Sequence, residues 1–169
     1  MQPDKFTTKF QSALSDAQSL AVGHDHQFIE PHHLLSALLD QRDGTTRHLL
    51  SVAGSNADAL RSQLGDALDR MAKVEGAGGD VRVSNDLSRM LNVTDKLAQD
   101  RGDQYISTEL FVLAAALDKG VLGDLVRGAG VDLQKVTQAV DSVRGGEPVN
   151  DAAAEENRRA LERFTVDLT

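Results

Sequence analysis

Apolar residues recur at spacings of three and four near the start of the chain, which is the pattern of one face of an α-helix. The first stripe comprises Phe6, Phe10, Ala13, Leu14, Ala17 and Ala21. Thr7 or Thr8 can cap the start of this helix, because a hydroxyl there can accept a hydrogen bond from the first turn. Gly23 can end it, because glycine tolerates the left-handed backbone of a helix C-terminus.

Three further helices are expected in the first 72 residues. One begins near Pro31, a residue suited to the first helical turn, and runs to about Asp40. A short one carries Leu49, Leu50 and Val52 and stops at Ala53-Gly54. The fourth carries Ala57, Leu60, Leu64, Ala67, Leu68 and Met71 at helical spacing.

A connector follows these helices. The stretch EGAGGDVRVSND, residues 75–86, has three glycines in its first half and no helical stripe. Val81 and Val83 alternate with polar residues, which favours a short extended piece at this place.

The pattern then repeats. At an offset of 77 residues, Leu87, Leu91, Thr94 and Ala98 match Phe10, Leu14, Ala17 and Ala21, and at the same offset Ile106, Phe111, Val112 and Ala114 match Ile29, Leu34, Leu35 and Ala37. At an offset of 76, Leu125, Val126, Ala129 and Gly130 match Leu49, Leu50, Ala53 and Gly54. A four-helix unit of this size buries little by itself, so the two copies are expected to pack on each other.

The predicted fold is therefore all-α, with two tandem pseudo-repeats of about four helices each packed as one domain. The domain is expected to span residues 1–146, with repeat one at 1–72, the connector at 73–83 and repeat two at 84–146. After Gly145 and Gly146 the chain turns polar, and residues 147–169 are expected to be a linker that leaves the domain.

Composition narrows the class of protein. The chain has 169 residues, a formal net charge of -8 and no cysteine. Disulfides and thiol chemistry are excluded, and an acidic chain without a cluster of Lys and Arg is a poor candidate for binding nucleic acid or anionic membrane. No run approaches membrane-spanning length, and the N-terminus has no apolar signal core. A cytoplasmic protein is expected.

The histidines are weak candidates for a metal site. They are His24, His26, His32, His33 and His48. Zinc needs three or four ligands at fixed geometry, and the second repeat has Glu109 and Leu110 in place of His32 and His33. We therefore expect no metal, with His24 and His26 in a solvated turn and His32 and His33 in the first turn of a helix.

Enzyme chemistry is not expected within these residues. The sequence lacks a Walker loop, a G-x-S-x-G motif and a cysteine nucleophile. Asp103 and Glu109 flank the start of a predicted helix, where negative charge is favourable. No catalytic residue and no cofactor is predicted for this chain.

A surface for binding another polypeptide remains. If the first repeat exposes His33, the second should expose Leu110, and Leu91 and Leu97 on the neighbouring helix could join it in a shallow apolar groove. The alternative is that Leu110 packs inside, between the two repeats.

Several stretches resemble a known family. The motif I-x-x-x-H-L-L-x-A-L, from Ile29 to Leu38, is similar to the Clp repeat. The stretches ALSDAQSLAVGHDHQFIEPHHLLSALL, VEGAGGDV, DKLAQDRGDQYISTELFVLAA and FTVDLT resemble the ClpB family of bacterial disaggregases from Phe6 to Thr169. The resemblance implies the N-terminal domain and linker of a hexameric parent, whose ATPase modules bind ATP and Mg²⁺ and lie outside this chain.

The resemblance also implies a function. Such a domain would bind unfolded or aggregated polypeptides, and the parent would disaggregate heat-damaged proteins together with a DnaK-type chaperone system. The matching substrate-binding positions are Thr7, Asp103 and Glu109, with Leu91, Leu97 and Leu110 as apolar neighbours. Acidic residues at the groove edge would favour segments carrying Lys or Arg. The isolated domain is expected to be a monomer.

Two rival functions remain open at this level. The domain could dock a folded adaptor, as in Clp relatives that feed a protease, and would then bind one partner tightly. It could also be a spacer that gates the pore of the parent, and would then bind neither class of partner.

Overall fold

A computed structural model describes residues 3–42, 44–74 and 81–155. These residues form eight α-helices, four in each repeat, preceded by a short 3₁₀ helix at Pro3–Lys5. Repeat one contains α1 (Thr8–Gly23), α2 (Pro31–Asp40), α3 (Thr46–Val52) and α4 (Ala57–Arg70). Repeat two contains α5 (Asn85–Asp100), α6 (Thr108–Leu117), α7 (Val121–Gly128) and α8 (Leu133–Arg144). The predicted all-α fold with two repeats is confirmed.

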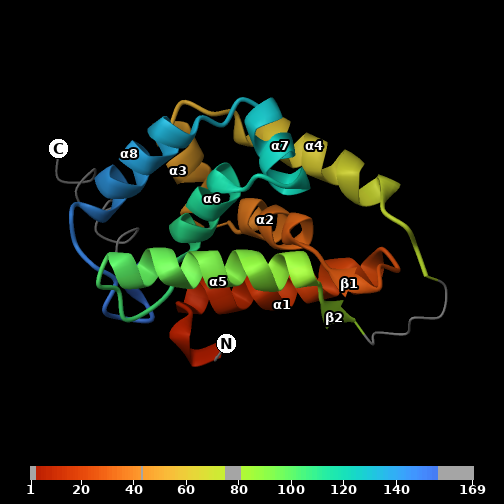
Figure 1. The fold of residues 1–169 in the computed structure, drawn as a ribbon, viewed down its shortest axis with the longest axis horizontal. Helices are drawn as coiled ribbons and strands as arrows, with labels where there is room; N and C mark the ends of the chain where they lie inside the picture. Colours follow the sequence, from red (N-terminus) through yellow and green to blue (C-terminus); the bar gives the residue numbers. More distant parts are fainter. Residues whose placement is uncertain (1–2, 43, 75–80, 156–169) are drawn as a thin grey trace.

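The helices form layers around a central pair. Figure 1 shows α1 and α5 along one side of the molecule, α3, α4, α7 and α8 along the other, and α2 and α6 between them. Every residue of α2 from Pro31 to Leu39 is buried, and so is every residue of α6 from Thr108 to Ala116. A helix that is enclosed on all sides needs apolar or fully bonded side chains all round, not a single stripe.

Two short parallel pairings join the repeats. Strand β1 (Phe28–Ile29) pairs with β2 (Arg82–Val83), with Ile29 opposite Val83, and an isolated bridge joins Phe6 to Ile106. The two pairings are equivalent under the 77-residue offset, since Phe6 corresponds to Val83 and Ile29 to Ile106. The segment that leads into α1 therefore pairs with the one that leads into α6, and the segment that leads into α5 pairs with the one that leads into α2. The extended piece predicted around Val83 is confirmed.

The caps of equivalent helices are also related. The Thr7 hydroxyl accepts a hydrogen bond from the Phe10 N–H at the start of α1, and the Ser84 hydroxyl accepts one from the Leu87 N–H at the start of α5. Gly54, expected to follow the end of α3, has the positive φ of 75° that favours glycine. Most of the predicted connector lies outside the described residues.

Candidate functional site

Leu110 lies in the core and not on the surface. Its side chain is 0% exposed, and so is that of His33 at the equivalent position of repeat one. The interpretation that His33 and Leu110 are both exposed is therefore wrong, and the alternative that Leu110 packs inside is confirmed. The reason is that α2 and α6 are the two central helices, and their first turns are covered by neighbouring elements in both repeats.

His33 can be buried without a large energetic cost because both of its ring nitrogens have polar partners. Its Nδ1 accepts a hydrogen bond from the Glu30 N–H at 2.8 Å, so the ring proton belongs on Nε2, which lies 2.8 Å from Nδ1 of His26. Burial, and after it the charges of three neighbouring histidines, lower the pKa of His33 to about 4. His26 is also buried, so the expectation of a solvated histidine turn is wrong there.

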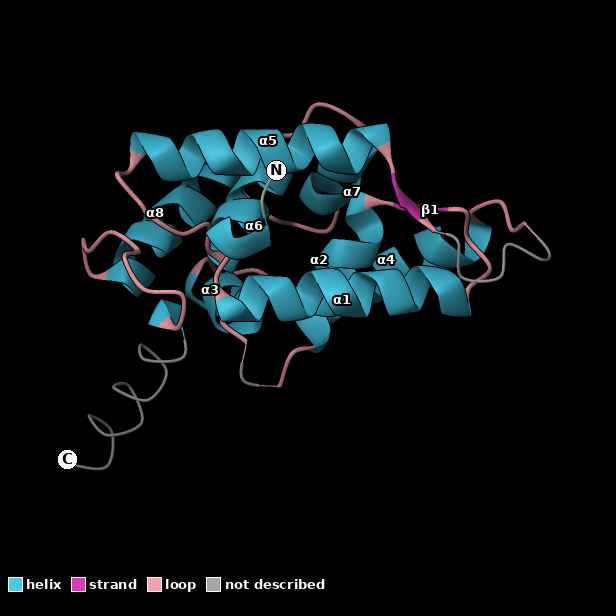
Figure 2. Cartoon of the chain, turned by 90° about the horizontal axis from the view of Figure 1, so that it is seen from below, coloured by secondary structure: helices cyan, strands magenta, loops and turns pink. Residues whose placement is uncertain are grey.

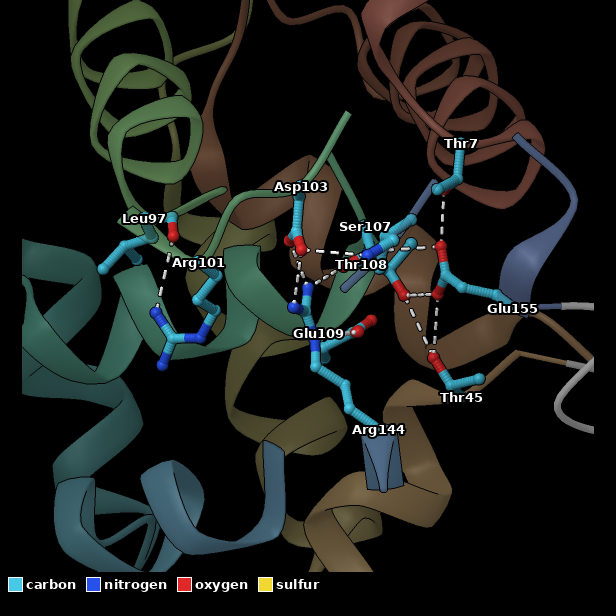
Figure 3. A network of polar contacts seen from close by, with 11 residues as sticks. Thr7, Thr45, Leu97, Arg101, Asp103, Ser107, Thr108, Glu109, Arg144 and Glu155 are labelled. Carbon is cyan, nitrogen blue, oxygen red and sulfur yellow. Dashed lines mark hydrogen bonds and ion pairs between the residues drawn. The ribbon is translucent and has the colours of Figure 1, made fainter. Parts of the chain in front are cut away.

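Thr7, Asp103 and Glu109 lie near one another, as the resemblance to the family implies, but they face inward. Figure 3 shows them in one network of polar contacts near the N-termini of α1 and α6. Thr7 and Glu109 are fully buried, and the carboxylate side chain of Asp103 has no exposed area. The prediction that Asp103 and Glu109 form an acidic groove edge is therefore wrong.

Arg144, the last residue of α8, neutralises both carboxylates. Its Nη1 and Nη2 donate to the two Asp103 oxygens at 3.0 and 2.7 Å, and its Nε donates to Glu109 Oε1 at 2.9 Å. Nη2 also donates to the Ser107 hydroxyl at 2.9 Å. Burial by itself lowers the pKa of Arg144, but the hydrogen bonds and charges of the two carboxylates outweigh it and raise that pKa.

The beginning of the predicted linker is docked on this network. We call residues 147–155 the strap. The Val149 side chain is buried, and its carbonyl accepts hydrogen bonds from the N–H groups of Gln104 and Tyr105. The Val149 N–H donates to Asp103 Oδ1 at 2.9 Å, and the Ala152 carbonyl accepts from the Thr8 N–H. The linker prediction at residues 156–169 lies outside the described residues.

Glu155 ends the strap in a buried site of three threonines, which we call the carboxylate clamp. Glu155 Oε1 accepts from the hydroxyls of Thr45, at 3.0 Å, and Thr108, and Oε2 accepts from the Thr7 hydroxyl and the Thr108 N–H. Glu155 is 1% exposed. The sequence did not identify Glu155 or Thr45, because no periodic pattern connects a residue in a polar tail to a helix 110 residues earlier.

An apolar groove lies elsewhere, between α1 and α5, which run along the same face of the molecule (Figures 1 and 2). Its volume is about 520 Å³, and it is lined by Phe6, Gln11, Leu14, Ser15, Gln18, Ile29, Val83, Leu87, Ser88 and Leu91. Of the three predicted groove leucines, only Leu91 lines it. Leu97 is partly buried against the core, and Leu110 is inside.

Two further findings concern metal binding and membrane-spanning helices. Within the described ranges, no group of three or more His, Asp or Glu side chains is arranged to hold a metal ion. None of the helices in the described part of the chain is both long enough and apolar enough to cross a membrane.

The fold and sequence define the class of protein. A family model described as the Clp repeat (R) N-terminal domain matches residues 5–129. The chain therefore belongs to this family of Clp repeat N-terminal domains.

The chain is also similar in sequence to one end of longer chaperone proteins. The chain is 54% identical over 169 residues to the chaperone protein ClpB of Vibrio vulnificus (strain YJ016), and 50% identical over 169 residues to ClpB of Pseudomonas putida. Each match covers the full chain but 20% of the relative, so the chain spans about a fifth of the length of these proteins.

Solved structures share the fold at low identity. The N-terminal domain of Hsp104 from Candida albicans superposes with a TM-score of 0.77 at 19% identity, covering 89% of this chain and 99% of that one. The N-domain of ClpV from Vibrio cholerae gives a TM-score of 0.69 at 18% identity, covering 86% and 88% of the two chains.

Proposed function

We propose that this domain binds unfolded or aggregated polypeptide on behalf of an ATP-dependent disaggregase of the cytoplasm. The observation that supports the proposal is the open apolar groove between α1 and α5, which six apolar and four neutral polar side chains line. In this proposal, ATP and Mg²⁺ binding, the hexameric state and cooperation with a DnaK-type system belong to parts of the parent outside this chain.

The chemistry of the groove favours weak binding of short apolar segments. Burying one leucine-sized side chain contributes only about 1.5–3 kcal/mol before the costs of association, so a single segment dissociates readily. Six domains tethered in one hexamer would raise the effective concentration of binding grooves near one substrate chain. Weak contacts then suffice to collect a chain and still allow its release.

In this proposal, the groove selects substrate segments by their apolar character more than by their charge. No charged side chain is among the residues that line it, whereas Asp103 and Glu109 are both bound to Arg144. We therefore expect binding to depend on Leu, Ile, Val and aromatic residues in the substrate, with little dependence on salt concentration.

Titration with a fluorescently labelled unfolded polypeptide tests the proposal. Val83 lines the groove and is 46% exposed, so Val83→Asp should place a charge there without disturbing the core and weaken binding about tenfold or more. The matched control is Val93→Asp on α5, because Val93 is 36% exposed and does not line the groove. Equal binding by both variants would contradict the groove as the site.

The same titration separates the rival functions. A spacer would show no binding to the polypeptide even before substitution. An adaptor-docking domain would also fail to bind it, and would instead bind a single folded partner tightly. A substitution of Leu110 cannot serve here, since Leu110 is a core residue.

A further inference from the structure

The strap follows α8 and ends in the carboxylate clamp. There the Glu155 side chain binds residues at the N-terminal ends of three helices. Thr7 caps α1, Thr45 precedes α3 and Thr108 begins α6. Figure 3 shows the Glu155 carboxylate between these three hydroxyls. The strap is therefore attached through Val149 near Asp103, through the Ala152 carbonyl at the start of α1 and through Glu155 at the clamp.

The clamp is built to receive a carboxylate. Its three hydroxyls and one N–H are all donors toward the two Glu155 oxygens, and the Thr45 and Thr108 hydroxyls lie 3.0 Å apart, so both can point their protons at one oxygen. Removing a carboxylate from water is costly, and these donors replace the water that it loses. An apolar residue at position 155 would leave the donors without their acceptor.

Besides the clamp, the contacts described for the strap are few. Val149 is its buried apolar residue, and the Glu147 N–H, the Val149 N–H and carbonyl and the Ala152 carbonyl form hydrogen bonds with the domain. Residues 147, 148, 150 and 151 are exposed. A segment with so few buried contacts is expected to open without unfolding of the helices beneath it.

We propose that Thr7, Thr45 and Thr108 form a carboxylate-binding site whose ligand is Glu155 of the same chain, and that its occupancy decides whether the strap is docked or free. Asp103 and Glu109 are positioning residues of this device. Asp103 accepts the Val149 N–H directly, and Glu109 holds Arg144, which in turn holds Asp103. Substitutions of Thr7, Asp103 or Glu109 are thus expected to release the strap.

Release would change the reach of the domain. Nine residues span at most about 30 Å when extended, so a free strap would let the domain move further, by less than this length, from whatever follows Glu155. This consequence rests on the proposed function, in which an ATPase module follows. The docking of the strap does not rest on it.

Amide hydrogen exchange followed by NMR tests the proposal on the full 169-residue chain. The reporters are the amides of Thr8, Gln104 and Tyr105, whose acceptors are strap carbonyls. Glu155→Ala should accelerate their exchange by at least about tenfold and leave the amides in the middle of α5 unchanged. Glu147→Ala is the matched control, because Glu147 is an exposed acidic residue of the same strap. Unchanged reporters in Glu155→Ala would overturn the proposal.

Two further measurements guard against a misfolded variant. Thr45→Val removes one donor while preserving shape, and it should accelerate the same reporters to a smaller extent. In the unsubstituted chain, the reporter amides should exchange by a local opening, faster than the core amides of α6. If they exchange only with global unfolding, the strap is a fixed part of the domain and the proposal is wrong. Neither result depends on polypeptide binding, so failure of the proposed function would be seen separately.

Discussion

His33 and Leu110 show how one place in a fold accepts two chemistries. The two residues are equivalent under the 77-residue offset, and both are fully buried. Leu110 needs no polar partner, whereas His33 requires the Glu30 N–H and His26 to satisfy its ring nitrogens. A histidine in such a place fits only while it is neutral, because a proton on Nδ1 would remove the acceptor that the Glu30 N–H uses.

This neutral histidine predicts a loss of stability in acid. The unfolded chain protonates histidine near pH 6.5, whereas the folded protein keeps His33 neutral down to a pKa of about 4. Stability is therefore fully present above pH 6.5 and is lost as the pH falls toward 4, by about 3 kcal/mol from His33 alone. The lowered pKa values of His26 and His32 act in the same direction.

Urea unfolding at several pH values between 7.5 and 4.5 measures this effect. His33→Gln is the comparison, since it removes the titrating group, and its stability should depend less steeply on pH over the same range. An equally steep dependence in both proteins would assign the acid sensitivity to other groups.

Among the arginines with described ion pairs, Arg144 is predicted to contribute most to the free energy of unfolding. Its side chain is 5% exposed, so Arg144→Met leaves two buried carboxylates without their cation and should lower the free energy of unfolding by about 3–5 kcal/mol. Arg61 also binds a carboxylate through two nitrogens, that of Asp40, but this pair is exposed, and Arg61→Met should cost about 1 kcal/mol or less. Similar losses in denaturant titrations of the two variants would contradict the buried network.

At the scale of elements, the start of α7 depends on a glycine that has a packing role. A Cβ at Gly123 would lie 1.8 Å from the Asp118 carbonyl oxygen, and the Asp118 carboxylate accepts the Gly123 N–H. The helix continues through Gly123, and the chain before the helix passes too close for a side chain at this position.

Gly123→Ala is therefore expected to destabilise the protein by about 2 kcal/mol or more, since backbone must shift to admit the methyl group. Gly128→Ala, in the last turn of the same helix, is the control. Apart from the adjacent backbone of its own helix, no heavy atom lies within 4 Å of its Cβ position, so alanine there should be neutral or stabilise by up to about 1 kcal/mol. Thermal unfolding of both variants by circular dichroism checks the difference, and equal effects would rule out the close approach.

At the scale of the molecule, the two repeats are parts of one cooperative unit. Two parallel pairings join them, Ile29 with Val83 just before α5 and Phe6 with Ile106. The central helices α2 and α6 are buried by elements of both repeats. We therefore expect residues 1–74 alone to be largely unfolded, because they would expose the faces of α2 and β1 that repeat two covers.

Calorimetry and circular dichroism test this expectation. The full chain should unfold in one transition, with equal calorimetric and van 't Hoff enthalpies, and the 1–74 chain should show no cooperative transition. Two separate transitions in the full chain, or a folded single repeat, would mean that the repeats are independent.

The sequence by itself determined the helices, the duplication and the family. Periodicity is local, so the stripe from Phe6 to Ala21 and the glycine after α3 could be assigned without knowledge of any partner. It also indicated that Thr7, Asp103 and Glu109 belong together, through resemblance to the family.

Only the tertiary structure decided which way those residues face. Leu110 is buried because α6 is a central helix, and the carboxylates of Asp103 and Glu109 are directed inward because Arg144, at the end of a different helix, lies between them. Glu155 joins three helix starts that are distant in sequence. Such placements depend on how the helices pack against one another. An amphipathic pattern indicates which face of a helix is buried, but it does not indicate which element covers that face.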